Sequence, residues 1–370
     1  MDETNLARPA PTPRVLLAGG GSGGHVFPAL AVGEELVRRG WQVSFAGRAE
    51  SMEERLASER GFQFVALAAK PLLGRGAAAQ LRALATLVGS TVAARRMVRA
   101  EAFDGVLGTG GYVSAAAVLG GRWAGRPVML LEPNATPGLA NRWLSRIAQG
   151  AAVAFEATAR ELRCPCWTTG VPVRAAFFAA SPVRPEGKPR LLVLGGSQGS
   201  QRLNRLLPPM LERLFAALPE LSVLHQTGEA HFESTLAAYR GAGVETPRLR
   251  VVPFVDNVPG AMTAVDLVVS RAGAITLAEI CAAGRPSLLL PLAIAAGHQE
   301  SNAQLLADAG AARVLADAEL DAASLGDALA ALLADRVELA RMGERARGLA
   351  RPDAAAAIAE RLGGLLEAAA

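Results

Sequence analysis

The stretch Arg14-Val-Leu-Leu-Ala-Gly-Gly-Gly-Ser-Gly-Gly-His25 decides how the first half of this chain folds. Its apolar residues run directly into a glycine-rich segment, which is typical of a buried strand that ends in a tight turn. The spacing that follows predicts a helix over about 28–39, stopped by Gly40, and a second strand over 41–46. The sequence therefore predicts a β-α-β unit, and with it a parallel sheet that carries helices on its faces.

The same design recurs in Arg190-Leu-Leu-Val-Leu-Gly-Gly-Ser-Gln-Gly199, and the proline-rich residues 181–189 before it predict a linker. A chain of 370 residues is also too long for one ordinary core. We therefore expect an α/β fold of two Rossmann-like, doubly wound parallel-sheet domains that face each other across a cleft. The first domain should span residues 1–172 and the second residues 173–352. A last helix over 353–370 is expected to pack back on the first domain.

The composition, 51% apolar and 19% charged, is that of a folded globular protein. The apolar runs are interrupted before the ~18–20 residues that a membrane-spanning helix needs. The first residues show no basic-then-apolar order of a secretory signal. Three cysteines and four histidines without metal-ligand spacing predict neither a disulfide framework nor a metal site. These features indicate a cytosolic protein.

The net charge of +4 is unevenly distributed. Up to Val173 the chain has 19 Lys and Arg against 13 Asp and Glu, and the remainder has 19 against 21. A basic first half predicts an anionic partner there, which would be a phosphorylated substrate, an anionic lipid or a nucleic acid. Nucleic acid is the weakest of the three, because the chain has two tyrosines and no runs of arginine with aromatic residues.

The glycine segment Gly19–His25 lies between a predicted strand and a predicted helix, where backbone N–H groups can bind a phosphate. A tight structural turn is the alternative. The G-x-G-x-x-G spacing also fits a dinucleotide, but the second strand ends at Gly47-Arg48, without the usual ribose-binding acid. The segment Gly195–Gly199 holds the corresponding place in the second half. We expect it to be a phosphate loop at the cleft.

Other polar segments follow predicted strands. Gly108-Thr-Gly-Gly-Tyr112 fits an anion site and a tight turn equally well. Glu279, one turn into a predicted helix, could accept bonds from ribose hydroxyls or lie on a solvated surface. Residues 297–302 suit sugar hydroxyls or helix capping. Because such segments should meet at the carboxyl ends of the strands, the sequence favours a sugar-nucleotide site.

Taken together, these motifs resemble those of the MurG family of bacterial UDP-N-acetylglucosamine transferases, in the family's order and over nearly the whole chain. The motifs that carry the resemblance are Gly20-Gly-Ser-Gly-Gly-His25, Gly110-Gly-Tyr-Val-Ser114, Glu132-Pro-Asn134, Gly170-Val-Pro-Val-Arg174, Gly195-Gly-Ser-Gln-Gly199, Ser270-Arg-Ala-Gly-Ala274 through Glu279, and His298-Gln299 with Asn302. The resemblance implies the GT-B fold of glycosyltransferase family 28. It implies transfer of GlcNAc from UDP-GlcNAc to the MurNAc C4 hydroxyl of undecaprenyl-pyrophosphoryl-MurNAc-pentapeptide, which turns lipid I into lipid II in peptidoglycan synthesis.

The transfer would invert the anomeric configuration and need no metal or other cofactor. The resemblance also implies a peripheral protein on the cytoplasmic face of the plasma (inner) membrane, with cell-wall synthesis proteins as partners. In the donor site, Glu279 would hold the ribose, the Val255 backbone the uracil and Ser197 a phosphate. The positions implied for UDP-GlcNAc are Ser22, Gly23, Gly24, Asn134, Arg174, Ser197, Val255, Ala274, Ile275, Thr276, Leu277, Ala278, Glu279 and Gln299. Ser22 stands where threonine is usual and keeps the hydroxyl.

His25 is our candidate for the base that accepts the proton of the attacking hydroxyl, because it lies at the cleft and a helix N-terminus should keep it neutral. Stabilising the loop or binding the acceptor pyrophosphate is the alternative role. Glu132 is the fallback base. Leu131-Glu-Pro-Asn134 stands where the family usually has His-Glu-Gln-Asn.

Residues 71–76 and 81–88 mix apolar and basic side chains, and we expect them, with Arg122-Trp123, to lie on an anionic membrane leaflet. An ordinary packed helix and loop is the alternative. Three other functions stay open from the sequence. They are a GT-B transferase that acts on a diacylglycerol or a small aglycone, a nicotinamide or flavin oxidoreductase, and a non-catalytic sugar-nucleotide sensor.

Overall fold

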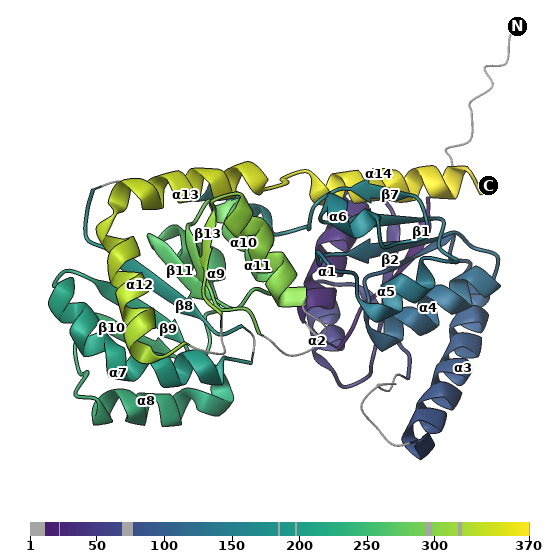
Figure 1. Ribbon diagram of the computed structural model, residues 1–370. Helices are drawn as coiled ribbons and strands as arrows, with labels where there is room; N and C mark the ends of the chain where they lie inside the picture. The colour runs from purple at the N-terminus through teal and green to yellow at the C-terminus, as the bar shows by residue number, and fades with distance from the viewer. Residues whose placement is uncertain are drawn as a thin grey trace, which may run out of the picture.

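The computed structural model describes residues 12–21, 23–68, 77–183, 186–196, 198–292, 298–316 and 320–369. Two twisted parallel sheets lie side by side, each covered by helices (Figure 1). Every strand pair in both sheets is parallel. The predicted α/β fold of two Rossmann-like sheets is confirmed.

In the described part of the chain, the first sheet has seven strands in the order β3-β2-β1-β4-β5-β6-β7. The strands are β1 (Arg14–Ala18), β2 (Gln42–Gly47), β3 (Gln63–Ala66), β4 (Gly105–Gly108), β5 (Val128–Glu132), β6 (Gly150–Val153) and β7 (Cys166–Thr168). The helices of this domain are α1 (Gly23–Arg38), α2 (Met52–Glu59), α3 (Ala77–Ala100), α4 (Gly111–Trp123), α5 (Leu139–Leu144) and α6 (Glu156–Ala159).

The second sheet has six described strands in the order β10-β9-β8-β11-β12-β13. They are β8 (Arg190–Leu194), β9 (Ser222–Gln226), β10 (Leu249–Val252), β11 (Leu267–Ser270), β12 (Ser287–Leu289) and β13 (Ala312–Val314). The helices around it are η1 (Ala175–Ala179), α7 (Gln201–Ala217), η2 (Glu229–His231), α8 (Phe232–Gly241), α9 (Val258–Thr263), α10 (Ala274–Ala283), α11 (His298–Asp308), α12 (Ala322–Ala334) and α13 (Arg336–Leu349).

Both central strands are buried on both faces, which explains why their sequences are continuously apolar. In β1, Val15 and Leu17 pack with α1, whereas Leu16 and Ala18 pack on the opposite face with α3 and α4. The residues of β8 alternate in the same way between a cluster with α7 and α12 and a cluster with α10 and α11. The period of two along each strand therefore builds two cores per sheet.

The last helix, α14 (Ala354–Glu367), leaves the second sheet and packs on the first. Its buried residues Ile358, Ala359 and Leu362 join the core that contains Val15 and α1, and Figure 1 shows α14 along this domain. The chain therefore passes between the sheets twice. The two passing segments touch, because a Cβ on Gly170 would lie 2.6 Å from the Cβ of Arg351.

Both sheets have a switch point where the chain reverses its direction of travel across the sheet. The chain moves from β1 outward to β2 and β3 and returns to the other side of β1 as β4, and it does the same around β8 and β11. Loops that leave strands at such a point diverge and open a crevice at the strands' carboxyl ends. The predicted glycine segments lie at these two switch points.

Candidate active site

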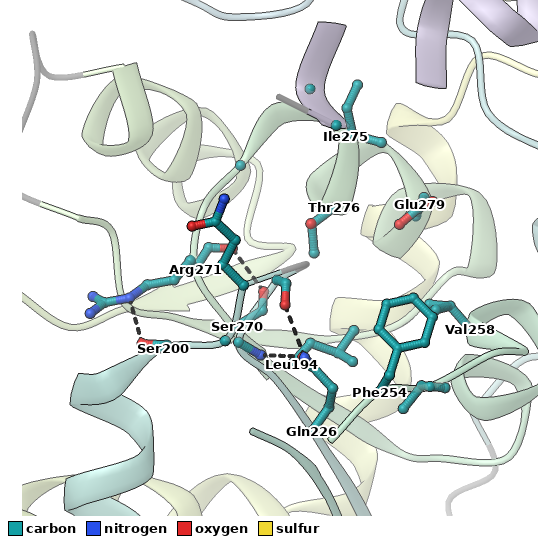
Figure 2. Close-up of a pocket in the computed structure, with 18 of the residues that line it drawn as sticks. Leu194, Ser200, Gln226, Phe254, Val258, Ser270, Arg271, Ile275, Thr276 and Glu279 are labelled. Carbon is teal, nitrogen blue, oxygen red and sulfur yellow. Dashed lines mark hydrogen bonds between the residues drawn. The ribbon is translucent and has the colours of Figure 1, made fainter. Parts of the chain in front are cut away.

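A cavity of about 1260 Å³ lies between the two domains. From the second domain it is lined by the loops after β8 and β11, by the start of α10 and by the segment after β10. From the first domain it is lined by Gly23, Gly24 and Phe27 of α1 and by the end of α2. Figure 2 shows the second-domain side chains that face this space. The cavity therefore joins the predicted donor segments to the first glycine loop.

The first glycine loop passes directly into α1. The helix begins at Gly23, so the predicted start near Pro28 was wrong by about one turn. Pro28 is instead inside the helix, where it cannot donate a bond to the carbonyl of Gly24. The glycines themselves form the first turn, and this places the helix N-terminus at the cavity. Ser22 lies outside the described residues.

The second glycine loop, after β8, is held in place by Gln226 at the end of β9. The Gln226 Oε1 atom accepts a bond from the Gly195 N–H at 3.0 Å, and its Nε2 atom donates to the Gly196 carbonyl at 3.0 Å and the Pro253 carbonyl at 3.3 Å (Figure 2). These bonds fix the backbone of Gly195 and Gly196. Ser197 lies outside the described residues, and its phosphate role stays a prediction. Sequence reasoning missed Gln226, because a strand-terminal glutamine has no distinctive spacing.

The start of α10 offers uncapped N–H groups to the cavity. Its N-cap is Gly273, which has no side chain to bond them, and Ala274, Ile275 and Thr276 line the space. Such a helix end attracts an anion. Leu277, by contrast, is buried in the core, and Ala278 is not among the lining residues. The predicted run 274–279 thus presents alternate faces to the cavity and the core.

Arg271 adds a fixed positive charge beside this helix end. Its Nε atom donates to the Ser200 hydroxyl at 3.0 Å (Figure 2). Its Nη1 atom donates to the Leu290 carbonyl at 3.0 Å. These bonds connect the loops that follow β8, β11 and β12. A guanidinium placed this way can neutralise a pyrophosphate. Arg271 belongs to the motif Ser270–Ala274, but the sequence pattern predicts no role for it.

Glu279 lines the same cavity one turn further along α10 (Figure 2). Burial raises the pKa of its carboxyl to about 7, and attraction to the exposed Arg174 partly opposes this rise. The carboxyl is therefore close to half protonated at neutral pH. Donors such as sugar hydroxyls would favour its ionised form and lower the pKa again.

An apolar surface faces Glu279 across the cavity. Phe254, with half of its surface exposed, Val255 and Val258 line this part of the space (Figure 2). A flat, uncharged ring such as uracil fits between apolar walls of this kind. The family resemblance implied Val255 but not Phe254, and an isolated aromatic residue in a loop predicts no particular role.

The polar segment at the start of α11 joins the two domains. Asn302 is fully buried, its Oδ1 atom accepts a bond from the Ala135 N–H at 2.8 Å, and its Nδ2 atom donates to Asn134 Oδ1 and the Ala272 carbonyl, both at 3.2 Å. His298 Nδ1 lies 2.9 Å from the Thr136 carbonyl. From the sequence, residues 297–302 suit either sugar hydroxyls or helix capping. In the structure they bond the loop after β5 to the second domain.

Gln299 and Asn134 have different positions around this junction. The Gln299 Oε1 atom accepts bonds from the N–H groups of Ala272 at 3.2 Å and Leu292 at 3.0 Å, and the residue lines the cavity. Asn134 is not among the lining residues and donates to Glu132 Oε1 at 2.9 Å. Their predicted contacts with the donor sugar stay predictions.

His25 lies on the first turn of α1, half-buried under the loop that follows β4. Its Nδ1 atom is 2.7 Å from the Thr109 carbonyl. Because a carbonyl can only accept, Nδ1 carries the proton and Nε2 keeps a lone pair. A Cβ on Gly110 would lie 2.7 Å from the His25 ring, so this close approach requires a glycine.

Burial is the main reason that the pKa of His25 lies below its ordinary value, and His298 adds to this. Glu132 and the bond to Thr109 act in the opposite direction. The imidazole is therefore neutral at pH 7, as a base requires. The sequence predicts neutrality from the helix N-terminus, and burial is a separate cause that the sequence did not indicate.

Glu132 is fully buried at the end of β5. Its Oε1 atom accepts bonds from the N–H and the side-chain amide of Asn134, and its Oε2 atom from the Gly138 N–H and the side-chain amide of Asn141. These bonds fix the loop that contacts Asn302. They also occupy both carboxylate oxygens. The cavity lining includes Gly23 and Gly24 but neither His25 nor Glu132, so the choice of base stays a prediction.

The chain matches the models of two domains of one enzyme family. The model of the glycosyltransferase family 28 N-terminal domain matches residues 15–153, and that of the C-terminal domain matches residues 190–358. With two Rossmann-like sheets around one cavity, these matches define a two-domain glycosyltransferase of the GT-B fold.

Comparison with individual proteins makes the assignment specific. The chain is 42% identical over 352 residues to UDP-N-acetylglucosamine–N-acetylmuramyl-(pentapeptide) pyrophosphoryl-undecaprenol N-acetylglucosamine transferase of Halorhodospira halophila, which covers 93% of this chain and 96% of that protein. It is 31% identical to the crystal structure of Acinetobacter baumannii MurG, with a TM-score of 0.79 over 96% of this chain and all of the other. The chain belongs to the MurG family. A Staphylococcus aureus MnaA–UDP structure, 12% identical with a TM-score of 0.70, shares the fold alone.

Proposed function

We propose that the chain transfers GlcNAc from UDP-GlcNAc to the MurNAc C4 hydroxyl of undecaprenyl-pyrophosphoryl-MurNAc-pentapeptide, the step from lipid I to lipid II. The observation that carries the proposal is one cavity with a carboxyl, an apolar wall and a helix N-terminus on one side and the glycine loop of His25 on the other. Two relatives, each 42% identical to this chain, are named as transferases with the same donor and acceptor, which supports the proposal.

The donor would bind along the second domain. Uracil would pack against Phe254 and Val255, and the ribose hydroxyls would donate to Glu279. The pyrophosphate would lie at the N-terminus of α10, beside Arg271 and the loop after β8. In this arrangement the anomeric carbon of the sugar points toward the first domain.

The chemistry then needs a base and a stabilised leaving group. His25 Nε2 would take the proton of the C4 hydroxyl while the hydroxyl oxygen attacks the anomeric carbon and the bond to the pyrophosphate breaks. Attack from the opposite face inverts the configuration and gives a β-1,4 link. The uncapped N–H groups of α10 and Arg271 would stabilise the charge on the departing UDP. Glu132 and the Thr109 carbonyl would stabilise the imidazolium that forms.

A transfer assay with labelled UDP-GlcNAc and a lipid I analogue tests this proposal. We expect labelled disaccharide product, and much less product from UDP-GalNAc or from a plain aglycone acceptor. Transfer to an aglycone or a diacylglycerol at the same rate would support a different GT-B transferase. Binding of UDP-GlcNAc without any turnover would support a sensor.

We also propose that the first domain binds the cytoplasmic face of the plasma membrane. In α3, the side chains of Leu81, Leu84 and Val88 share one face and are 67%, 51% and 57% exposed. On the neighbouring α4, Trp123 is 54% exposed, and the Arg95 guanidinium lies 4.6 Å from its ring centroid. An apolar face with cations beside it suits an anionic leaflet. The predicted contact segment 71–76 lies outside the described residues.

Among the described residues, no helix is both long and apolar enough to cross a bilayer. Co-sedimentation with vesicles tests the peripheral contact. Leu84→Glu should weaken binding to vesicles that contain anionic lipid, and added salt should weaken binding of the unchanged protein. Binding that responds to neither would contradict the proposal. Cell-wall synthesis proteins remain proposed partners.

A further inference from the structure

One wall of the cavity has no part in binding the donor as proposed above. From the first domain, Arg55, Leu56, Glu59 and Arg60 line the cavity. The spacing i, i+1, i+4, i+5 places them on one face of α2 and the turn that follows it. Figure 1 shows α2 beside α1, at the edge of the first domain that faces the second. This wall is therefore available to the acceptor.

The start of α2 is anchored next to the loop of the candidate base. Glu53, on the first turn of α2, is buried and accepts a bond from the Gly21 N–H at 3.3 Å. With a rise of about 1.5 Å per residue, Arg55 and Arg60 lie roughly 3 and 10 Å further along the helix axis. The wall formed by these α2 residues thus begins beside the loop that contains His25.

The two arginines are charged groups of different mobility. The Arg55 side chain is 70% exposed, and its Nε atom lies 3.9 Å from Glu59, a contact that stabilises little. The Arg55 guanidinium can therefore leave Glu59 and pair with another anion. Arg60 is held more firmly, because its Nε atom donates to Glu34 at 3.0 Å and its Nη1 atom to the Leu56 carbonyl at 3.0 Å.

The proposed acceptor carries carboxylates that can pair with these arginines. In a muramyl peptide, the peptide is attached through the lactyl ether at C3, next to the C4 hydroxyl that is to react. With that hydroxyl at the loop of His25, the peptide must leave along a cavity wall. Five extended residues span about 17 Å, so a carboxylate at the end of the peptide comes within reach of this wall.

We propose that Arg55 and Arg60 form a subsite that binds carboxylates of the acceptor's peptide. This inference rests on the proposed function, and it assigns a peptide-recognition role to residues that the donor chemistry does not use. The subsite would act on acceptor affinity and leave the transfer step itself unchanged.

The test combines variants with matched acceptors. The variants are Arg55→Gln, Arg60→Gln and the control Arg48→Gln, an exposed arginine of the same domain that does not line the cavity. The acceptors are a lipid I analogue with free peptide carboxylates and the same analogue with those carboxylates amidated. We expect Arg55→Gln to raise KM for the free-carboxylate acceptor about three- to tenfold, with kcat and the KM for UDP-GlcNAc unchanged. Arg48→Gln should have no effect.

With the amidated acceptor, the wild type and the Arg55→Gln variant should have the same KM. An equal KM increase with both acceptors would overturn the proposal. It would mean that the arginine binds the acceptor's pyrophosphate or only stabilises the fold. A change in the KM for UDP-GlcNAc, or no change at all, would also overturn it. Thermal melts show whether Arg60→Gln folds, and Arg55 alone suffices if it does not. Failure of the wild type to use either acceptor would instead refute the proposed function.

Discussion

Replacing Glu279 by glutamine removes the group whose ionisation should control donor binding near neutral pH. Burial raises the pKa of this carboxyl to about 7 in the free protein, so half of the molecules carry a proton there at pH 7. Ribose hydroxyls that donate to the carboxylate stabilise its ionised form and return the pKa toward its ordinary value, 4.5. Binding should therefore release protons and strengthen as the pH rises.

The magnitude follows from the two pKa values. With a free value near 7 and a bound value near 4.5, the Kd for UDP-GlcNAc should be about tenfold higher at pH 6 than at pH 8. At pH 7, binding should release about half a proton per site. UDP-GlcNAc is a better ligand than UDP here, because its pyrophosphate has no terminal phosphate that titrates in this range.

Isothermal titration calorimetry in buffers of different ionisation enthalpy measures both quantities. Glu279→Gln should bind with a Kd that no longer depends on pH between 6 and 8, and with no linked proton. A flat profile in the unchanged protein, or proton uptake on binding, would refute the reasoning. The same pH dependence in the Glu279→Gln variant would assign the titration to another group.

Three further predictions concern the base, the domain junction and the last helix. His25→Gln should lower kcat by about 10²–10⁴-fold with the KM for UDP-GlcNAc unchanged, and a kcat within threefold of the wild type would remove His25 as the base. In the unchanged enzyme at saturating donor, the acid limb of kcat/KM for the acceptor should lie below pH 6.5, because burial lowers the pKa of His25. Asn302→Ala should lower the free energy of unfolding by about 2 kcal/mol in urea titrations, because it leaves the buried Ala135 N–H without its partner. Leu362→Ala, in the core between α14 and the first sheet, should lower the free energy of unfolding by about 3 kcal/mol in the same titration. An unchanged midpoint of unfolding would mean that α14 contributes little to the stability of that domain.

Much of the fold could be predicted because local patterns determine it. The strand-to-glycine runs at Arg14 and Arg190 predict two buried parallel strands, and both strands are buried in the structure. The start of α1 could not be placed, since proline at residue 28 suggested a helix start but is tolerated inside the helix.

Less of the site could be predicted from the sequence, because tertiary contacts decide the roles of its residues. Asn302 suited a sugar hydroxyl or a helix cap, yet its bonds cross between the domains. Gln226 looked like an ordinary strand residue, yet it fixes the second glycine loop. Arg55 and Arg60 have no motif of their own. They reach the cavity because α2 lies at the edge that faces the second domain.

The linkage in the transfer product, determined by NMR, is the decisive measurement for the proposed transfer. Given UDP-GlcNAc and a lipid I analogue, the protein should make one disaccharide, with GlcNAc joined through a β link to C4 of MurNAc. An α link, attachment at another hydroxyl, or release of free GlcNAc without transfer would show that the proposed reaction is wrong.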